Sequence, residues 1–181
     1  PADLFLWATA QTRPILFLEN KSLYGLRQYR PPTWCKREDI IENTGTRITL
    51  IGNELKHPDV VLVGYGGVAP YVLDSIKELK KESIRVLVII PEQVSPIGEK
   101  LLEILRRIGS PLLIVEESEP KFGWGAEMMA QILERGNQVS IRRVGATQTL
   151  VPASPLMERE VLPGVAAVLK ETYALLEGSD N

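Results

Sequence analysis

One short segment has the spacing of a nucleotide-binding turn. Gly64-Tyr65-Gly66-Gly67-Val68-Ala69 matches the pattern Gly-x-Gly-x-x-Ala, and it lies between an apolar run and a pattern typical of a helix. In such turns the backbone N–H groups at the helix start bind a diphosphate, and an acidic residue binds the ribose. Glu92, which follows the next apolar run, would be that acid.

A structural explanation accounts for the same segment with fewer assumptions. Any tight turn from strand to helix favours glycine, because glycine adopts backbone angles that are closed to other residues. Glu92 also lies farther along the chain than the roughly 20 residues that separate turn and acid in dinucleotide-binding folds. Nucleotide binding by Gly64, Gly66, Gly67 and Glu92 is therefore kept as an alternative hypothesis.

A second glycine-rich segment, Gly123-Trp124-Gly125-Ala126-Glu127, follows the acidic residues Glu116, Glu117 and Glu119. It opens a predicted helix at the carboxyl edge of the sheet, where open α/β folds place their binding sites. One interpretation is an interface loop, because aromatic residues are enriched at the centres of protein interfaces. The other is an ordinary helix start whose aromatic side chains pack on the core, and the sequence leaves both open. The candidate interface residues are Phe122, Gly123, Trp124, Gly125 and Glu127.

Residues that commonly do covalent or metal chemistry are sparse. His57 is the only histidine, and no serine, cysteine or carboxylate accompanies it in a pattern typical of a charge relay. Cys35 is the only cysteine, so the chain can form no internal disulfide and offers no second thiol to a zinc ion. The sequence predicts no catalytic, cofactor-binding or metal-ligating residue.

The composition is that of a globular protein without a strongly charged partner. Of the 181 residues, 44% are hydrophobic and 24% charged, and the formal net charge is -2, so we expect neither a nucleic acid nor a membrane as partner. The longest apolar runs, such as Val60 to Val63, are far shorter than a membrane helix. The first residues lack the basic region of a signal peptide, so the expected location is cytoplasmic.

Short β-branched runs alternate with helical patterns from Asp59 onward, which indicates βαβ units and a parallel sheet. A strand at 47–51 precedes them, and the last run alternates in polarity, so it should lie nearer an edge. Ser95 and Pro96 are expected to cap and open one helix, and Gly109 to end it. The predicted fold is a three-layer α/β/α domain with a mostly parallel sheet of about five strands. Strands are expected at 60–64, 84–90, 112–116 and 139–144, and helices at about 68–81, 95–108, 125–134 and 163–176.

The part before residue 47 differs in character. Residues 3–9 are expected to finish a helix and 15–18 to form a strand, while Pro31, Pro32 and Trp34 indicate a stiff connector. Near the other end, the segment Glu158 to Leu162 mixes acidic with apolar residues. Such a surface would suit a basic partner.

Five segments of the chain carry motifs that occur together, and in this order, in one family. Pro14 to Lys21 with Leu23-Tyr24 matches P-V-x-F-x-E-H-K-x-L-Y, and Asp59 to Gly66 matches D-V-T-x-V-x-Y-G. Ser95-Pro96-Ile97 matches S-P-x-D with Gly98 in place of the aspartate. Glu116-Glu117 with 123–127 matches E-E and G-x-G-A-E, and 151–158 matches P-x-A-x-x-L-E with one extra residue. The chain thus resembles the beta subunit of thiamine-diphosphate-dependent 2-oxo acid dehydrogenases, such as pyruvate dehydrogenase, whose C-terminal domain is of the transketolase C-terminal type.

The resemblance implies a division of the chain and a role in assembly. It makes 1–30 the remnant of a pyrimidine-binding domain, 31–46 a linker, 47–176 the transketolase C-terminal-like domain and 177–181 a tail. The family holds thiamine diphosphate and magnesium through a Gly-Asp-Gly and Asn motif on a separate domain and activates the coenzyme with a glutamate on the pyrimidine domain, and we find neither feature here. The isolated chain is therefore expected to bind no cofactor and to be inactive.

The resemblance also implies partners. They would be further copies of the chain, or an alpha-type subunit carrying the diphosphate-binding domain, with the acyltransferase component as a further candidate. The parent reaction would be oxidative decarboxylation of a 2-oxo acid. An independent protein-interaction module is the third hypothesis that the sequence leaves open.

Overall fold

The structure is a computed structural model that describes residues 2–26, 29–136, 138–147 and 150–178. A six-stranded sheet forms the centre of the protein. The strand order is β1-β2-β4-β3-β5-β6. Strands β4, β3, β5 and β6 are parallel, whereas β1 and β2 form an antiparallel hairpin that pairs with β4. The strands are β1 (Lys36–Ile41), β2 (Arg47–Gly52), β3 (Val60–Gly64), β4 (Val86–Pro91), β5 (Leu112–Val115) and β6 (Ile141–Val144).

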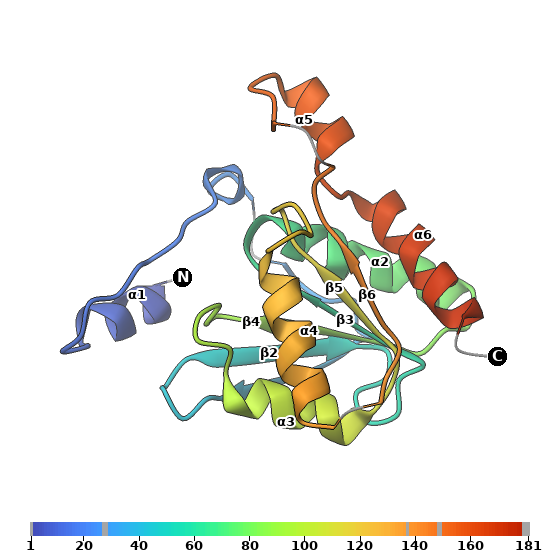
Figure 1. Ribbon diagram of the computed structural model, residues 1–181, viewed down its shortest axis with the longest axis horizontal. Helices are drawn as coiled ribbons and strands as arrows, with labels where there is room; N and C mark the ends of the chain where they lie inside the picture. The colour runs from blue at the N-terminus through green and yellow to red at the C-terminus, as the bar shows by residue number, and fades with distance from the viewer. Residues whose placement is uncertain (1, 27–28, 137, 148–149, 179–181) are drawn as a thin grey trace.

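Helices cover both faces of this sheet, so the predicted three-layer architecture is confirmed (Figure 1). One apolar cluster joins the sheet to α3 (Glu99–Ile108) and α4 (Trp124–Glu134), and the other joins it to α2 (Ala69–Lys81) and α6 (Val165–Glu177). Strand β3 supplies Val61 and Val63 to the first cluster and Val60 and Leu62 to the second, as a strand buried on both faces should. The remaining elements are α1 (Ala2–Thr9), α5 (Pro155–Val161) and the short 3-10 helices η1 (Lys21–Leu23) and η2 (Gly66–Val68).

The order of the parallel strands creates a switch point between β3 and β5. The chain passes from β3 through α2 to β4 on one side, then returns through α3 to β5 on the other. Gly64 and Val115, the last residues of β3 and β5, are therefore direct neighbours. In open α/β sheets the crevice outside such a point is the usual binding site. Strand β6 lies at the edge of the sheet, as its alternating sequence predicts.

The region before β2 differs from the sequence prediction in two places. The expected linker contains strand β1, whose polar sequence conceals it because the strand is mostly exposed. A hairpin creates it: Glu42 N–H donates to the Thr46 carbonyl at 2.8 Å, and Gly45 adopts a φ of 91°. The strand expected at 15–18 is absent; the segment is extended but pairs with no strand, and Leu16 is 84% exposed.

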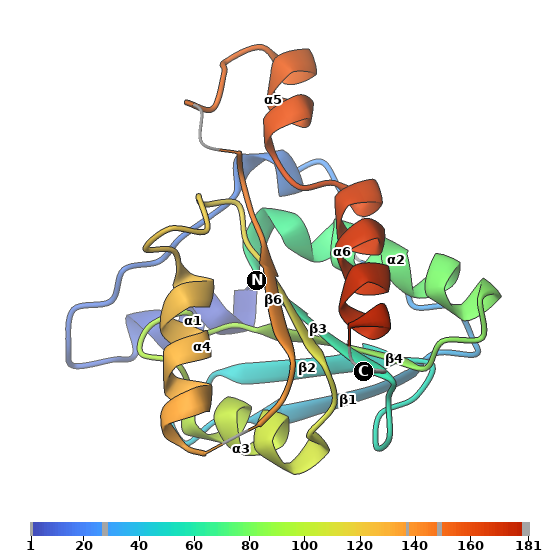
Figure 2. The same ribbon diagram turned by 45° about the vertical axis from the view of Figure 1, so that its right-hand side comes forward.

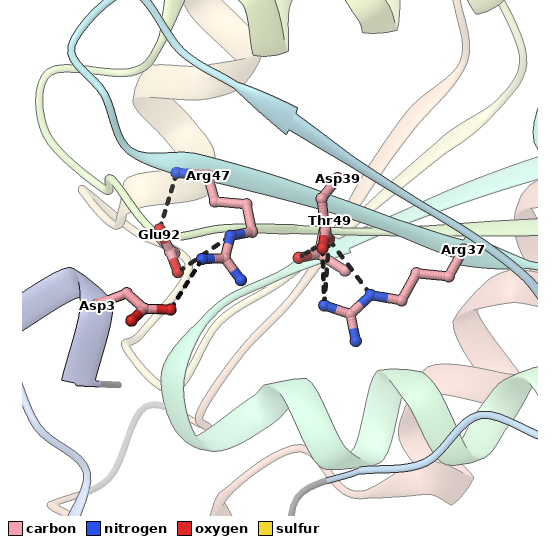
Figure 3. Close-up of polar contacts among 6 residues, drawn as sticks. All are labelled: Asp3, Arg37, Asp39, Arg47, Thr49 and Glu92. Carbon is pink, nitrogen blue, oxygen red and sulfur yellow. Dashed lines mark hydrogen bonds and ion pairs between the residues drawn. The ribbon is translucent and has the colours of Figure 1, made fainter.

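Helix α1 forms as predicted and rests on the turn of this hairpin. The Trp7 indole N–H donates to the Thr44 carbonyl at 2.8 Å. Arg47 lies 3.5 Å from the Asp3 carboxylate on α1 and 3.9 Å from Glu92, and its backbone N–H donates to Glu92 (Figure 3). The helix itself buries no residue, and these polar contacts together with an edge-to-face contact between Phe5 and Phe17 hold it in position.

Helix α3 begins four residues later than predicted, because the side chain that caps it is Glu42 and not Ser95. Gly98 occupies the N-cap position, and the Glu42 carboxylate accepts hydrogen bonds from the backbone N–H groups of Leu101 at 3.0 Å and Lys100 at 3.3 Å. A Cβ at position 98 would lie 2.1 Å from Glu42 Oε1. The carboxylate expected from an aspartate at 98 is thus supplied by Glu42, and Gly98 leaves the space for it. Gly109, with φ 67°, ends the helix as predicted.

We predict that Glu42 and Gly98 behave as a coupled pair. Glu42→Ala should lower the free energy of unfolding by about 1 to 3 kcal/mol, because it removes a charged acceptor from a helix start. Gly98→Asp should destabilise the wild type, in which the new side chain meets Glu42, but should recover part of the loss in the Glu42→Ala background. Thermal denaturation of the four proteins measures the coupling, and strictly additive effects would contradict it.

Candidate functional site

The two glycine-rich segments of the sequence meet at the switch point. Tyr65 follows β3 and Trp124 opens α4, and their rings are in edge-to-face contact with centroids 4.8 Å apart. Glu116 and Glu117 follow β5 directly beside them. Asn20 reaches the same place from the N-terminal segment. We refer to these five residues as the carboxyl-edge cluster.

The buried side chain of Glu116 holds the loop between β5 and α4 in place through hydrogen bonds. This side chain is completely buried, accepts a hydrogen bond from the Ser118 hydroxyl at 2.5 Å, and accepts another from the Gly125 N–H at 3.2 Å. A buried carboxylate needs such donors, and the first turn of a helix also attracts negative charge. A Cβ at Gly123 or Gly125 would lie 2.5 or 2.8 Å from the Glu116 carboxylate. Both glycines therefore make room for this carboxylate.

Hydrogen bonds to Glu117 connect the N-terminal segment to the sheet. The Asn20 amide donates to both of its carboxylate oxygens, at 2.9 and 3.1 Å. The Asn20 carbonyl oxygen accepts from the Ser22 N–H at 3.0 Å and the Ser22 hydroxyl at 2.6 Å, so both ends of this amide are engaged. The contact joins residues 97 positions apart, and no local pattern of sequence could have revealed it.

The same two side chains fill the space in which a nucleotide diphosphate would lie. A Cβ on Gly67 would come within 2.0 Å of the Glu117 carboxylate and 2.1 Å of the Asn20 amide. A carboxylate over the N–H groups at the start of α2 repels an anion. Glu92, the acid suggested for the ribose, accepts a hydrogen bond from the Arg47 N–H at 2.8 Å. The geometry thus disfavours the nucleotide alternative.

Burial shifts the protonation of this cluster. Burial raises the pKa of Glu117 and the nearby charge of Glu158 adds to the rise, against the hydrogen bonds from Asn20, which lower the pKa. Burial likewise raises the pKa of Tyr65, and the negative charges of Glu116 and Glu117 raise it further. Both shifts favour the uncharged forms of the two side chains and reflect the cost of burying charge at this edge of the sheet.

The two aromatic residues of the candidate interface have different environments, one packed against the core and one exposed. Trp124 packs against the core, and its indole N–H donates to the Val94 carbonyl at 2.8 Å, as the helix-start interpretation expects. Phe122 is fully exposed and adopts a φ of 58°, which is unusual for an aromatic residue. The Arg143 guanidinium donates to the Pro120 carbonyl and so braces the loop from β6. Glu127 is exposed and accepts a hydrogen bond from Gln131.

The remaining candidates from the sequence lie away from the cluster. His57 is exposed in the turn before β3. Cys35 is half-buried beside the second apolar cluster; burial raises the pKa of its thiol, while the charge of Lys80 lowers it. Among the described residues, no three His, Cys, Asp or Glu side chains are placed to hold a metal ion. Within the same ranges, no helix has the length and apolar character needed to cross a bilayer.

We predict that Glu117→Gln stabilises the protein at neutral pH. The raised pKa means that wild-type stability is complete below the ordinary value of 4.5 and declines as the pH rises through the pKa of the folded state. Glutamine keeps an acceptor for Asn20 without the buried charge or the repulsion from Glu158. Its unfolding temperature should therefore exceed that of the wild type at pH 7, and the difference should shrink in acid.

Glu117→Ala is the control for this experiment. It removes both the charge and the acceptor, leaving the Asn20 amide without its partner, so it should be less stable than the glutamine variant at every pH. A wild type and a glutamine variant with identical pH profiles would show that burial of the Glu117 charge has no cost.

The chain matches the family described as "Transketolase, C-terminal domain" over residues 53–168. It is 26% identical over 176 residues to the beta subunit of acetoin:2,6-dichlorophenolindophenol oxidoreductase from Bacillus subtilis (strain 168), covering 96% of this chain and 49% of that protein. It is 27% identical over 168 residues to the pyruvate dehydrogenase E1 component subunit beta from Staphylococcus epidermidis, covering 91% of this chain and 49% of that protein.

A solved structure described as a split gene transketolase, inactive beta4 tetramer, has a similar fold. Its TM-score is 0.59 at 23% identity, over 67% of this chain and 40% of that chain. The present chain spans about half the length of the curated relatives it matches. The match over residues 53–168 includes β3, β5 and the carboxyl-edge residues Tyr65, Glu116, Glu117 and Trp124. The chain therefore belongs to the transketolase C-terminal domain family.

Proposed function

We propose that this chain is the C-terminal part of a pyruvate dehydrogenase-like beta subunit and that it serves subunit assembly through the carboxyl edge of its sheet. The observation that carries the proposal is Phe122, a fully exposed aromatic side chain on a loop braced from both sides. The motifs of the sequence and the similarity to two beta subunits support the choice of parent enzyme. The parent reaction would be oxidative decarboxylation of a 2-oxo acid.

The carboxyl edge suits docking better than chemistry because its own side chains fill it. Asn20 and Glu117 occupy the space over Gly67, and Glu116 is committed to Ser118 and Gly125. Thiamine diphosphate and magnesium do not fit this arrangement, since Asn20 and Glu117 already fill the space over Gly67 that a diphosphate would need. In the proposed enzyme a companion alpha-type subunit holds both, and this chain contributes no step of the reaction.

Phe122 has the properties of an anchor for a partner subunit. Burial of a phenylalanine side chain is worth about 1.5 to 3 kcal/mol, and none of that is gained within this chain. The left-handed backbone at Phe122 costs energy in isolation. Glu116 and Arg143 hold the loop in place before any partner arrives, so little order remains to be gained on binding.

Further apolar side chains surround the same end of the molecule. Helix α5, η1 and the loop between β5 and α4 lie together at one end in both views (Figures 1 and 2). These segments expose large side chains that a solitary domain would normally bury, and such patches are typical of interfaces. Glu158 and Glu160 on α5 would suit a basic acyltransferase component as a second partner. The exposed apolar residues of the β5–α4 loop and α5 are Phe122, Leu156 and Met157.

Substitution of Phe122 tests the assembly role. Phe122→Ser should weaken binding to the companion subunit that carries the diphosphate-binding domain by at least about tenfold, the equivalent of about 1.4 kcal/mol. Leu133→Ser, at an exposed leucine near the far end of α4, is the matched control and should bind like the wild type. Calorimetric titration of each variant against the companion gives the affinities. Equal affinities for all three proteins would refute the role of this loop.

The cofactor division between subunits is tested by activity measurements. We expect no decarboxylation of a 2-oxo acid by this chain alone with thiamine diphosphate and magnesium, and turnover only when the companion and a pyrimidine-binding domain with the activating glutamate are both supplied. Turnover by the isolated chain would overturn the proposal.

A further inference from the structure

Strand β1 is the outermost strand of the sheet next to β2, and its other side is open (Figure 2). It pairs with β2 from Lys36 to Ile41, and within the described ranges no other strand approaches it. Its residues are exposed except Ile40, which is partly buried. An open edge of this kind is a template for a further strand, so natural proteins normally protect it.

The unpaired backbone groups of β1 belong to Arg37, Asp39 and Ile41. Glu42 N–H donates to the Thr46 carbonyl, and hydrogen-bonded pairs alternate along an antiparallel ladder. Residues 40, 38 and 36 therefore bond to β2, and the N–H and C=O groups of the intervening residues point outward. Independent support comes from the opposite side of β2, where Glu92 N–H donates to the Arg47 carbonyl and thus sets the same alternation.

The charges along β1 are arranged in a self-complementary order. Lys36 and Arg37 are followed by Glu38 and Asp39, so each face of the strand carries one positive and one negative residue two positions apart. On one face Arg37 already contacts Asp39 at 3.0 Å, and Asp39 accepts from the Thr49 hydroxyl at 2.8 Å (Figure 3). In an antiparallel copy centred on Glu38, Arg37 and Asp39 would each meet the opposite charge, whereas a parallel copy in register would place every charged residue of β1 opposite the same residue.

We propose that two copies of this chain associate through β1 into one continuous antiparallel sheet, with Arg37 of each copy opposite Asp39 of the other. A two-fold axis perpendicular to the sheet relates the strands and keeps each face on the same side, as a symmetric dimer requires. Arg37 and Asp39 are then a hydrogen-bonded pair across the axis, because both have outward backbone groups. Glu38 meets its own copy but lies diagonally next to Lys36 of the other chain, which offsets the repulsion.

The alternative is that these charges only protect the edge. Charged residues on edge strands commonly prevent pairing, but a protecting set of one sign repels a second copy in every register. The order found here attracts an antiparallel copy. The apolar side chain of Ile41, which is 50% exposed at the end of β1, would also gain cover. The proposal rests on the assembly role described above and identifies a second surface for it.

Charge reversal tests the pairing. Glu38→Lys/Asp39→Lys makes the strand basic throughout, and Lys36→Glu/Arg37→Glu makes it acidic throughout. We expect the wild type to dimerise with rising concentration in sedimentation velocity, and each variant alone to lose at least about tenfold in association constant. An equimolar mixture of the two variants should regain the dimer. Glu103→Lys/Glu134→Lys, at exposed positions of α3 and α4, changes net charge as the basic variant does and should associate like the wild type.

Several results would overturn the proposal. They are a wild type that stays monomeric at every concentration, variants that dimerise as strongly as the wild type, or a mixture that stays monomeric although thermal unfolding shows both variants folded. Hydrogen exchange gives a local readout, since the amides of Arg37, Asp39 and Ile41 should slow with concentration. The β1 variants should keep their affinity for the companion subunit, so a failure here is distinguishable from a failure of the Phe122 experiment.

Discussion

The two carboxylates that follow β5 hold the carboxyl edge of this protein together. Glu116 is completely buried and points to the start of α4, while Glu117 points to Asn20 and the space over Gly67. A carboxylate removed from water needs hydrogen-bond donors in place of the solvent it has lost. The Gly125 N–H group, the Ser118 hydroxyl and the Asn20 amide supply them here. The β5–α4 loop and the N-terminal segment take their positions from that requirement.

Among the described residues, carboxylates lie against glycines near three helix starts. Gly67 lies under Glu117, Gly123 and Gly125 lie against Glu116, and Gly98 lies against Glu42. In each case a Cβ would come within 3 Å of a carboxylate oxygen. The glycines that look like a ligand-binding motif in the sequence therefore make room for the protein's own acids at helix starts. This explains why a glycine-rich turn at a switch point need not bind a nucleotide.

The elements that could be predicted from the sequence are those whose side chains are buried with a regular period. Strand β3 is apolar throughout because both of its faces are covered, and α2 shows one apolar face. Strand β1 has charged and exposed residues, so its pattern resembles a loop until the hairpin turn at Gly45 is considered. Helix α5 buries no residue and has no period to detect.

The candidate site was predictable in location but not in content. The glycine-rich segments and the acidic pair indicate the edge on which they meet, because parallel strands end together. The division between Trp124 and Phe122 depends on the Val94 carbonyl and on Arg143 of β6, which reach the loop from other elements. Contacts between residues so distant in sequence leave no trace in local patterns.

The two proposed surfaces, the carboxyl edge and strand β1, are compatible with each other. Strand β1 runs in the same direction as the parallel strands, so antiparallel pairing of two copies directs their carboxyl edges to opposite ends of the joint sheet, where each can bind a companion without obstructing the other.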